Sequence, residues 1–226
     1  LYRYAERIIT DYQEMEQAMH QKRETLRIGS TVTISNILLP SLIHSYQQLF
    51  PEIRLEVTVN NGGYLQQALT DGRLDIALIE DSIHLQDLQA EEFASDQLVL
   101  LVPPSHPLAA KHTACIKDLQ GLPFLNRDSG SAVREYTDHI LKDNDVQVDM
   151  IWQSTSTRAI VNAVKEGLGI TILPYRMCTQ DIEQGHVIPV TLKDVSLVRH
   201  YYAVTHRQKI MTGALLQWIR LLQKEK

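Results

Sequence analysis

Residues 26–57 read LRIGSTVTISNILLPSLIHSYQQLFPEIRLEV, and this stretch decides the fold class. The apolar run over 26–30 predicts a buried strand. Apolar residues then recur at helical spacing over 37–50, and Pro40 fits the first turn of that helix because no intrahelical hydrogen bond is lost there. Alternating apolar residues over 55–59 predict the next strand. A strand, a helix and a second strand in succession indicate a parallel sheet with helices on its faces.

The same alternation continues on both sides of a proline-rich break. Further strands are predicted at 74–79, 98–102, 124–126, 146–151, 170–173, 187–190 and 200–205, with an additional strand residue at Phe93. Further helices are predicted at 64–70, 132–142, 158–165 and 213–223, and 180–186 is predicted to be a loop. Because Pro103, Pro104 and Pro107 separate the two series, the sequence predicts an α/β fold in two lobes.

Residues 1–24 contain neither glycine nor proline and predict a helix that precedes the two lobes. Its apolar residues form one narrow seam at a 4-3-4-3-4 spacing, namely Leu1, Ala5, Ile8, Tyr12, Met15 and Met19. Such a seam is typical of a helix that pairs with a second helix, so we expect it to mediate dimerisation. The alternative is a terminal helix that packs on its own domain.

Composition narrows the class of function. With 226 residues, 44% hydrophobic and 22% charged, the chain is an ordinary globular protein. A net charge of −5 disfavours a nucleic-acid-binding surface, which usually needs a basic patch. No apolar run is long enough to span a membrane, and the charged N-terminus does not resemble a signal peptide. Cys115 and Cys178 lie far apart, so we expect two reduced, mostly buried thiols in a cytoplasmic protein.

Catalytic and metal-binding motifs are not found. The sequence has neither a G-x-S-x-G elbow nor a G-x-x-x-x-G-K-[ST] phosphate loop. Its nine histidines are scattered, and His106 and His112 lack the spacing of zinc ligands. We therefore expect no catalytic residue, no metal and no cofactor. Among the paired carboxylates, Glu80 is the one expected to line a cleft, because it follows a predicted strand.

Hydroxyl residues gather at three predicted strand-to-helix junctions, at 29–33, 128–131 and 154–157. Ligands of open α/β sheets bind outside the carboxyl ends of the strands, where helix starts offer unpaired N–H groups. Hydroxyl groups at these points can add donors to a bound anion. The alternative is that each hydroxyl caps its own helix. Arg134 and Arg158 lie a few residues into these helices and are expected to add only long-range positive potential.

Four stretches of the sequence resemble LysR-type transcription regulators, in the order expected for that family. Besides 26–57, they are LTDGRLDIALIE at 69–80, LVLLVPPSHPLA at 98–109 and STSTRAIVNAVKEGLGITILP at 154–174. The resemblance implies an effector-binding domain with a type II periplasmic-binding-protein-like fold. In that fold, two Rossmann-like lobes are joined by two crossover strands. It also implies that a winged helix-turn-helix domain precedes these residues in the full regulator.

The resemblance further implies how the chain is divided and assembled. The implied parts are a linker and dimerisation helix at 1–24, lobe I at 25–101 plus 203–226, lobe II at 104–200, and crossovers near 101–103 and 201–203. The protein would be a homodimer or homotetramer, and helix 37–50 of one subunit would lie against lobe II of another. DNA would be contacted only through the preceding domain, and no membrane would be involved.

In the family, the cleft between the lobes holds a small effector that is often anionic. Carried over to this sequence, the effector-binding residues are Thr31, Thr33, Gly130, Ser131, Ser154 and Thr155. The most similar branch of the family senses sulfur oxyanions through a GSGTRE-like motif, which here reads GSAVRE at 130–135. This departure removes one hydroxyl donor, so it favours a larger, partly apolar acid over a small inorganic oxyanion.

Two other functions share the fold. A solute-binding protein of a transport system is one alternative, but such receptors are usually monomers without a dimerising helix. An enzyme such as a dehydratase is the other, but the sequence offers no coherent set of acid and base residues. We therefore expect an effector sensor that controls transcription.

Overall fold

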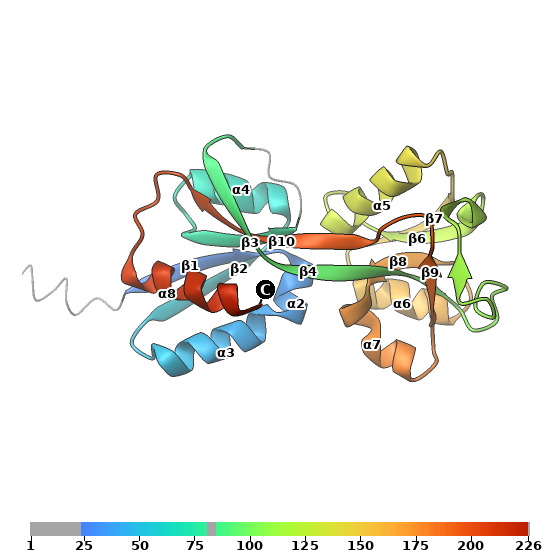
Figure 1. Cartoon of the computed structure of the whole chain (residues 1–226), viewed down its shortest axis with the longest axis horizontal. Coiled ribbons are helices and arrows are strands. Elements are labelled where there is room, and N and C mark those ends of the chain that lie inside the picture. The colour runs from blue at the N-terminus through green and yellow to red at the C-terminus, as the bar shows by residue number, and fades with distance from the viewer. Residues whose placement is uncertain (1–23, 81–84, 226) are drawn as a thin grey trace, which may run out of the picture.

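Two long strands, β4 (Leu88–Val102) and β10 (Val198–His206), run side by side through the molecule and join its two lobes (Figure 1). They belong to a computed structural model that describes residues 24–80 and 85–225. Apart from Glu24, the predicted linker helix lies outside the described residues. Strands and helices alternate in both lobes, so the predicted two-lobed α/β fold is confirmed.

The sheet of lobe I contains segments from both ends of the chain. Its strands lie in the order β2-β1-β3-β10-β4, where β1 is Thr25–Ser30, β2 is Arg54–Val59 and β3 is Ile76–Glu80. β1 is parallel to both β2 and β3, whereas β10 is antiparallel to both β3 and β4. The helices of this lobe are α2 (Val32–Ile37), α3 (Leu39–Leu49), α4 (Gly62–Thr70) and α8 (Gly213–Leu222), which the short turn η2 (Gln223–Glu225) follows.

Helices cover both faces of this sheet, with α3 and α8 on one side and α4 on the other (Figure 1). Ile76 and Leu78 pack in the cluster that contains α3 and α8, whereas Ala77 and Ile79 pack in the cluster that contains α4. This alternation follows from the period of two of an extended strand. It also explains why β3 reads as a continuous apolar run, since a strand covered on both faces has no solvent side.

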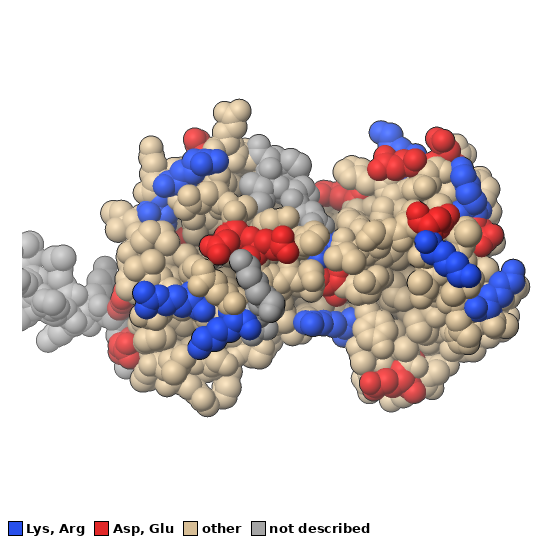
Figure 2. Space-filling model, viewed as in Figure 1, with Lys and Arg blue, Asp and Glu red and all other residues tan. Residues whose placement is uncertain are grey.

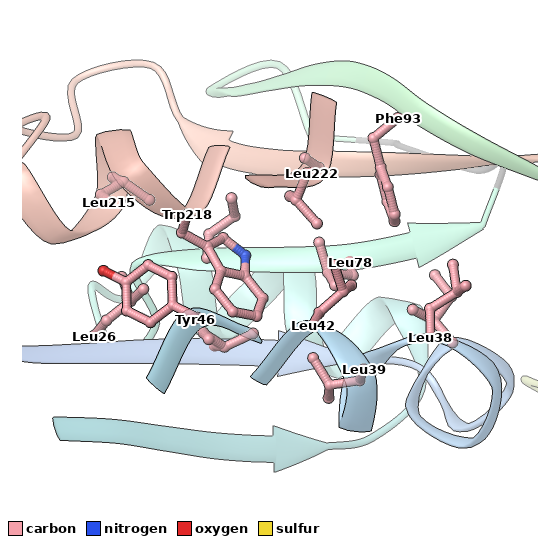
Figure 3. Packing of buried hydrophobic residues seen from close by; sticks show 14 of the residues in the cluster. Leu26, Leu38, Leu39, Leu42, Tyr46, Leu78, Phe93, Leu215, Trp218 and Leu222 are labelled. Carbon is pink, nitrogen blue, oxygen red and sulfur yellow. The ribbon is translucent and has the colours of Figure 1, made fainter. Parts of the chain in front are cut away.

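Two aromatic residues attach the C-terminal helix α8 to α3 (Figure 3). The ring centroids of Tyr46 and Trp218 lie 5.3 Å apart, with the rings inclined by 65°. The Tyr46 hydroxyl donates a hydrogen bond of 2.9 Å to the carbonyl oxygen of Ala214. Burial raises the pKa of Tyr46 to about 12, so the hydroxyl keeps its proton at neutral pH. Helix α8 therefore completes the core of lobe I.

Lobe II contains the continuation of β4 and a separate two-stranded sheet. β4 pairs antiparallel with β8 (Thr171–Pro174) and β9 (Ile188–Leu192), and β9 pairs parallel with β5 (Thr113–Ala114). The second sheet is the parallel pair β6 (Pro123–Arg127) and β7 (Asp149–Ser154). The helices of this lobe are α5 (Ala132–Asp143), α6 (Thr157–Lys165), α7 (Tyr175–Glu183) and the short turn η1 (Ile116–Leu119).

β4 exchanges its partners where it passes between the lobes. Residues 88–97 pair with β10, whereas Leu98 and the residues after it pair with β8 and β9. The predicted division into lobes stays a prediction. We propose that the first crossover lies near Gln97–Leu98, because the partners change there.

Two local predictions are wrong. The helix expected at 37–50 is two helices, α2 and α3, with Leu38 between them. Pro40 explains the break, because its ring would clash with the carbonyl of Asn36 if α2 continued straight into α3. The loop expected at 180–186 is helical as far as Glu183, because α7 turns Met177, Cys178 and Ile182 toward an apolar cluster. The polar residues between them conceal that pattern in the sequence.

The expectations about cysteines and membrane spans can also be compared with the structure. Both thiols are free, and Cys178 is buried as expected, but Cys115 is exposed. Burial raises the pKa of the Cys178 thiol to about 12. In the part of the chain that the structure describes, no helix has both the length and the apolar character needed to cross a membrane.

Candidate functional site

A cavity of about 310 Å³ is lined by residues of both lobes, at the carboxyl ends of their strands. Lobe I contributes 31–33, 59–62 and Glu80, which end or follow β1, β2 and β3. Lobe II contributes six residues that end or follow β6 and β7, namely Arg127, Asp128, Gly130, Ser131, Ala132 and Thr155. Pockets for small molecules usually measure roughly 300–1,000 Å³, so the cavity suits a small ligand.

Five of the six residues predicted to bind an effector line this cavity, namely Thr31, Thr33, Gly130, Ser131 and Thr155. Ser154 is not among the lining residues. Its hydroxyl accepts a hydrogen bond of 3.1 Å from the backbone N–H of Ser156, and its carbonyl accepts one of 3.2 Å from Arg127 Nε. Ser154 therefore holds the loop in shape. Whether the other five residues bind a ligand stays a prediction.

Thr31 lies directly after β1 and brings a buried hydroxyl to the cavity. Its backbone N–H donates to the carbonyl of Leu78 at 3.1 Å, which fixes it against β3. The side chain is buried, and its hydroxyl has no hydrogen-bond partner among the residues that the structure describes. It does not cap α2. A buried hydroxyl without a partner costs free energy, which a ligand that bonds to it would recover.

Ser131 holds the corresponding position in lobe II, at the start of the twelve-residue helix α5. Its side chain makes no capping hydrogen bond, although it occupies the capping position. Gly130 precedes it with φ of +87°, a conformation that glycine adopts at no steric cost. The first N–H groups of a helix lack intrahelical partners and carry partial positive charge. Ser131 therefore stands where an anion would be stabilised.

At the third junction, 154–157, one hydroxyl residue caps a helix and another lines the cavity. The Ser156 hydroxyl accepts a hydrogen bond of 3.2 Å from the backbone N–H of Ala159, so it is a helix cap. Thr155, one residue earlier, lines the cavity. Capping thus accounts for Ser156 but not for Thr31 or Ser131.

Arg127 supplies a fixed positive charge that the sequence did not predict. It is buried at the end of β6 and lines the cavity. Its guanidinium donates to Thr157 Oγ1 at 3.0 Å and pairs with Asp128 at 3.4 Å. The arginines singled out from the sequence pair elsewhere, Arg134 with Asp138 and Arg158 with Asp181. The predicted strand ended at residue 126, which left Arg127 unnoticed although it stands at a strand end.

The acidic and amide residues of lobe I complete the lining. Glu80 lines the cavity, as expected from its place after a predicted strand. Asn60 and Asn61 were missed, although they too follow a strand. The Asn61 side chain caps α4 by accepting from the N–H of Tyr64 at 2.9 Å. Within 24–80 and 85–225, no group of three or more His, Cys, Asp or Glu side chains is arranged to hold a metal ion.

Comparison with known proteins gives the family. The family model of the LysR substrate binding domain matches residues 20–226. The uncharacterized HTH-type transcriptional regulator YeiE of Escherichia coli (strain K12) is 30% identical over 219 residues, which are 97% of this chain and 74% of YeiE.

Two solved structures show the same fold. The CcmR regulatory domain of Synechocystis PCC6803, solved in complex with 2-PG, has a TM-score of 0.82 at 21% identity and covers 89% of this chain and 96% of that one. The effector binding domain of QuiR, solved in complex with shikimate, has a TM-score of 0.79 at 16% identity and covers 90% and 97%. The chain therefore belongs to the LysR family of transcription regulators and carries the family's effector-binding domain, with a type II periplasmic-binding-protein-like fold.

Proposed function

We propose that the cavity between the lobes binds a small organic acid, and that its occupancy controls transcription. The proposal is based on the polar groups that both lobes present to the same cavity. Lobe I offers the unpartnered hydroxyl of Thr31, and lobe II offers the uncapped start of α5 at Ser131 beside the Arg127 guanidinium. An anion that contacts both sets is stabilised by hydroxyl donors, the helix terminus and a positive charge.

Such a ligand would act by selecting one arrangement of the lobes. A ligand shifts a conformational equilibrium only by the difference between its affinities for the two states. Because the proposed contacts come from both lobes, their number depends on how the lobes are placed relative to each other. The two strands that join the lobes would carry the change to the dimer contacts.

We further propose that the regulator acts without catalysis and without a cofactor, in the cytoplasm, as a homodimer or homotetramer. DNA contact would be made by a helix-turn-helix domain of the regulator, since the relative YeiE is of HTH type. Self-association is supported by exposed apolar residues on both lobes. Leu49 of α3 is 60% exposed, and Trp152 of β7 is 40% exposed. These residues suit the expected contact of α3 with lobe II of a second subunit.

A thermal-shift screen of small organic acids tests the proposed function. A ligand present at 100 times its dissociation constant stabilises the folded state by about 2.7 kcal/mol, which is readily measured as a rise in Tm. We expect at least one small carboxylate or phosphate ester to raise the Tm, and its neutral amide or alcohol analogue to leave it unchanged. Equal shifts for acids and their neutral analogues would contradict the proposal.

A further inference from the structure

We infer that the ligand of this cavity carries a hydrogen-bond donor, a hydroxyl or an ammonium group, which Glu80 accepts. The inference rests on the proposed function, because it assumes that an acid binds between the lobes. It goes further by assigning the ligand to one chemical class, the hydroxy acids and amino acids. It also assigns to Glu80 a role in recognising the ligand.

Glu80 presents a buried carboxylate to the cavity. It is the last residue of β3, it is 2% exposed, and it lines the cavity directly. Neither of its carboxylate oxygens has a hydrogen-bond partner among the described residues. A buried, ionised carboxylate needs compensating donors, because it has lost its hydration. The described residues supply no such donor, and a ligand in the cavity that carries an O–H or N–H group can supply it.

The cation nearest to Glu80 among the described residues does not donate a hydrogen bond to it. Arg199 Nη1 lies 3.9 Å from Glu80 Oε1, which is an ion pair but too long for a hydrogen bond. The same guanidinium lies closer to a second carboxylate, with Arg199 Nη2 at 3.2 Å from Asp96 Oδ2. All three side chains are buried. One guanidinium thus faces two carboxylates, and when all three groups are ionised one negative charge remains uncompensated.

The two sides of the cavity therefore differ in the ligand groups that they favour. Arg127 and the start of α5 favour an anion on the side of lobe II. Glu80 repels an anion on the side of lobe I and favours a group with an O–H or N–H to donate. Thr31 can complement either group, because a hydroxyl both donates and accepts. A molecule with an acid at one end and a donor at the other satisfies both sides.

Matched acids test this inference by calorimetric titration of the whole chain. One pair is shikimate, with its ring hydroxyls, and cyclohexene-1-carboxylate, which has the same ring and acid but no hydroxyl. A second set is 3-phosphoglycerate, O-phosphoserine and 3-phosphooxypropionate, which differ only in carrying a hydroxyl, an ammonium or neither. In the set that the cavity accommodates, we expect the donor-bearing member to bind about tenfold more tightly or better. The second set also distinguishes a hydroxyl from an ammonium.

Two variants locate the preference at Glu80. Glu80→Gln should reduce the preference for the donor-bearing acid to about threefold or less and should tighten binding of the donor-free acid, since the repulsion is gone. Asp128→Asn is the matched control, because it removes the same charge from the same cavity at a carboxylate already paired with Arg127. It should change both affinities alike and keep their ratio.

Three outcomes would overturn the inference. Acids that bind equally well with and without a donor show that Glu80 selects nothing, although the proposed function then still stands. A preference that stays at about tenfold or more in Glu80→Gln shows that another residue is responsible, because the neutral amide of Gln is a weaker acceptor than a carboxylate. Failure of every acid in both sets to bind, together with a thermal-shift screen in which no small acid raises the Tm, contradicts the proposed function and the inference together. The circular dichroism spectrum of Glu80→Gln shows whether this variant folds. If it does not, the affinities of the wild-type chain for acids with and without a donor still test the inference.

Discussion

The hydroxyl residues of this protein have different roles at equivalent positions, and hydrogen bonding separates them. Ser156 caps a helix, Ser154 holds a loop, and Thr31 and Ser131 have no such bond. The sequence could predict that these residues lie near strand ends, because the strand and helix patterns are clear. The sequence could not predict which hydroxyl caps a helix and which makes no capping bond, because this depends on side-chain rotamers and on the path of the loop.

Thr31→Val and Ser131→Ala are each expected to weaken binding of the organic acid about tenfold or more, since a hydrogen bond to a charged group contributes about 1.5–3 kcal/mol. Stability should change little, because neither hydroxyl has a structural bond to lose. Ser156→Ala is the matched control and should lower the free energy of unfolding by about 1 kcal/mol while leaving affinity unchanged. Calorimetric titration and urea unfolding measure the two quantities. Unchanged affinity in both Thr31→Val and Ser131→Ala would mean that the ligand lies elsewhere.

Asp75 should make stability depend on pH in the acid range. Burial alone would raise its pKa, but hydrogen bonds from Arg27 and Lys209 outweigh burial and hold the pKa below its ordinary value of 3.8. The shortest of the Arg27 contacts is 2.7 Å, from its backbone N–H. A depressed folded-state pKa gives stability that is complete above pH 3.8 and is lost as pH falls through the lower folded value. Urea midpoints of wild type and Asp75→Asn should therefore differ most above pH 3.8 and converge as the pH falls through the lower folded pKa. A difference that stays constant with pH would exclude this role.

At the scale of secondary structure, strong apolar periodicity was predictable and its interruptions were not. α5 and α6 begin within one residue of the predicted positions, because a turn or cap precedes a clear amphipathic pattern. The break at Pro40 and the helix α7 were missed, since each depends on packing against another element. The same applies to the cavity. Arg127 and Asn60 line it because strands of both lobes end there, and no local pattern marks such residues.

The attachment of α8 to α3 gives a prediction at this scale. Tyr46→Phe removes the hydrogen bond to Ala214 and keeps the ring against Trp218, so it should lower the free energy of unfolding by about 0.5–1.5 kcal/mol. Tyr64→Phe serves as its control. The Tyr64 hydroxyl accepts a bond of 2.9 Å from Arg73, but the residue is exposed, so the loss should stay below about 0.5 kcal/mol. If both variants lose the same free energy of unfolding in urea, the buried hydrogen bond of Tyr46 stabilises the fold no more than the exposed one of Tyr64.

At the scale of the whole molecule, charge and apolar surface should determine what the domain binds. Positive and negative side chains are mixed over the face seen in Figure 2, without a continuous basic stripe. Together with the net charge of −5, this leads us to expect no sequence-selective DNA binding by this chain on its own. A mobility-shift assay at physiological salt measures it. A tight complex that survives competitor DNA would contradict the expectation.

Self-association should depend on the exposed apolar residues of α3 and β7. Leu49→Glu and Trp152→Glu each place a charge on the proposed contact, so we expect either variant to raise the monomer fraction at tens of micromolar, measured by light scattering. Ile210→Glu is the control, because Ile210 is 79% exposed and belongs to neither α3 nor β7. A mass distribution that neither Leu49→Glu nor Trp152→Glu alters would place the dimer contact on another surface.

The position of β10 has a consequence for the order in which the protein is made. β10 lies between β3 and β4 in the sheet, yet the ribosome adds it only after the whole of lobe II. Until then, the N-terminal strands have an open edge at β3, and Trp218 is still missing from their core. An unpaired, apolar edge invites pairing with other chains during synthesis. We therefore expect the nascent chain to depend on chaperones until β10 and α8 have been synthesised and close the first lobe.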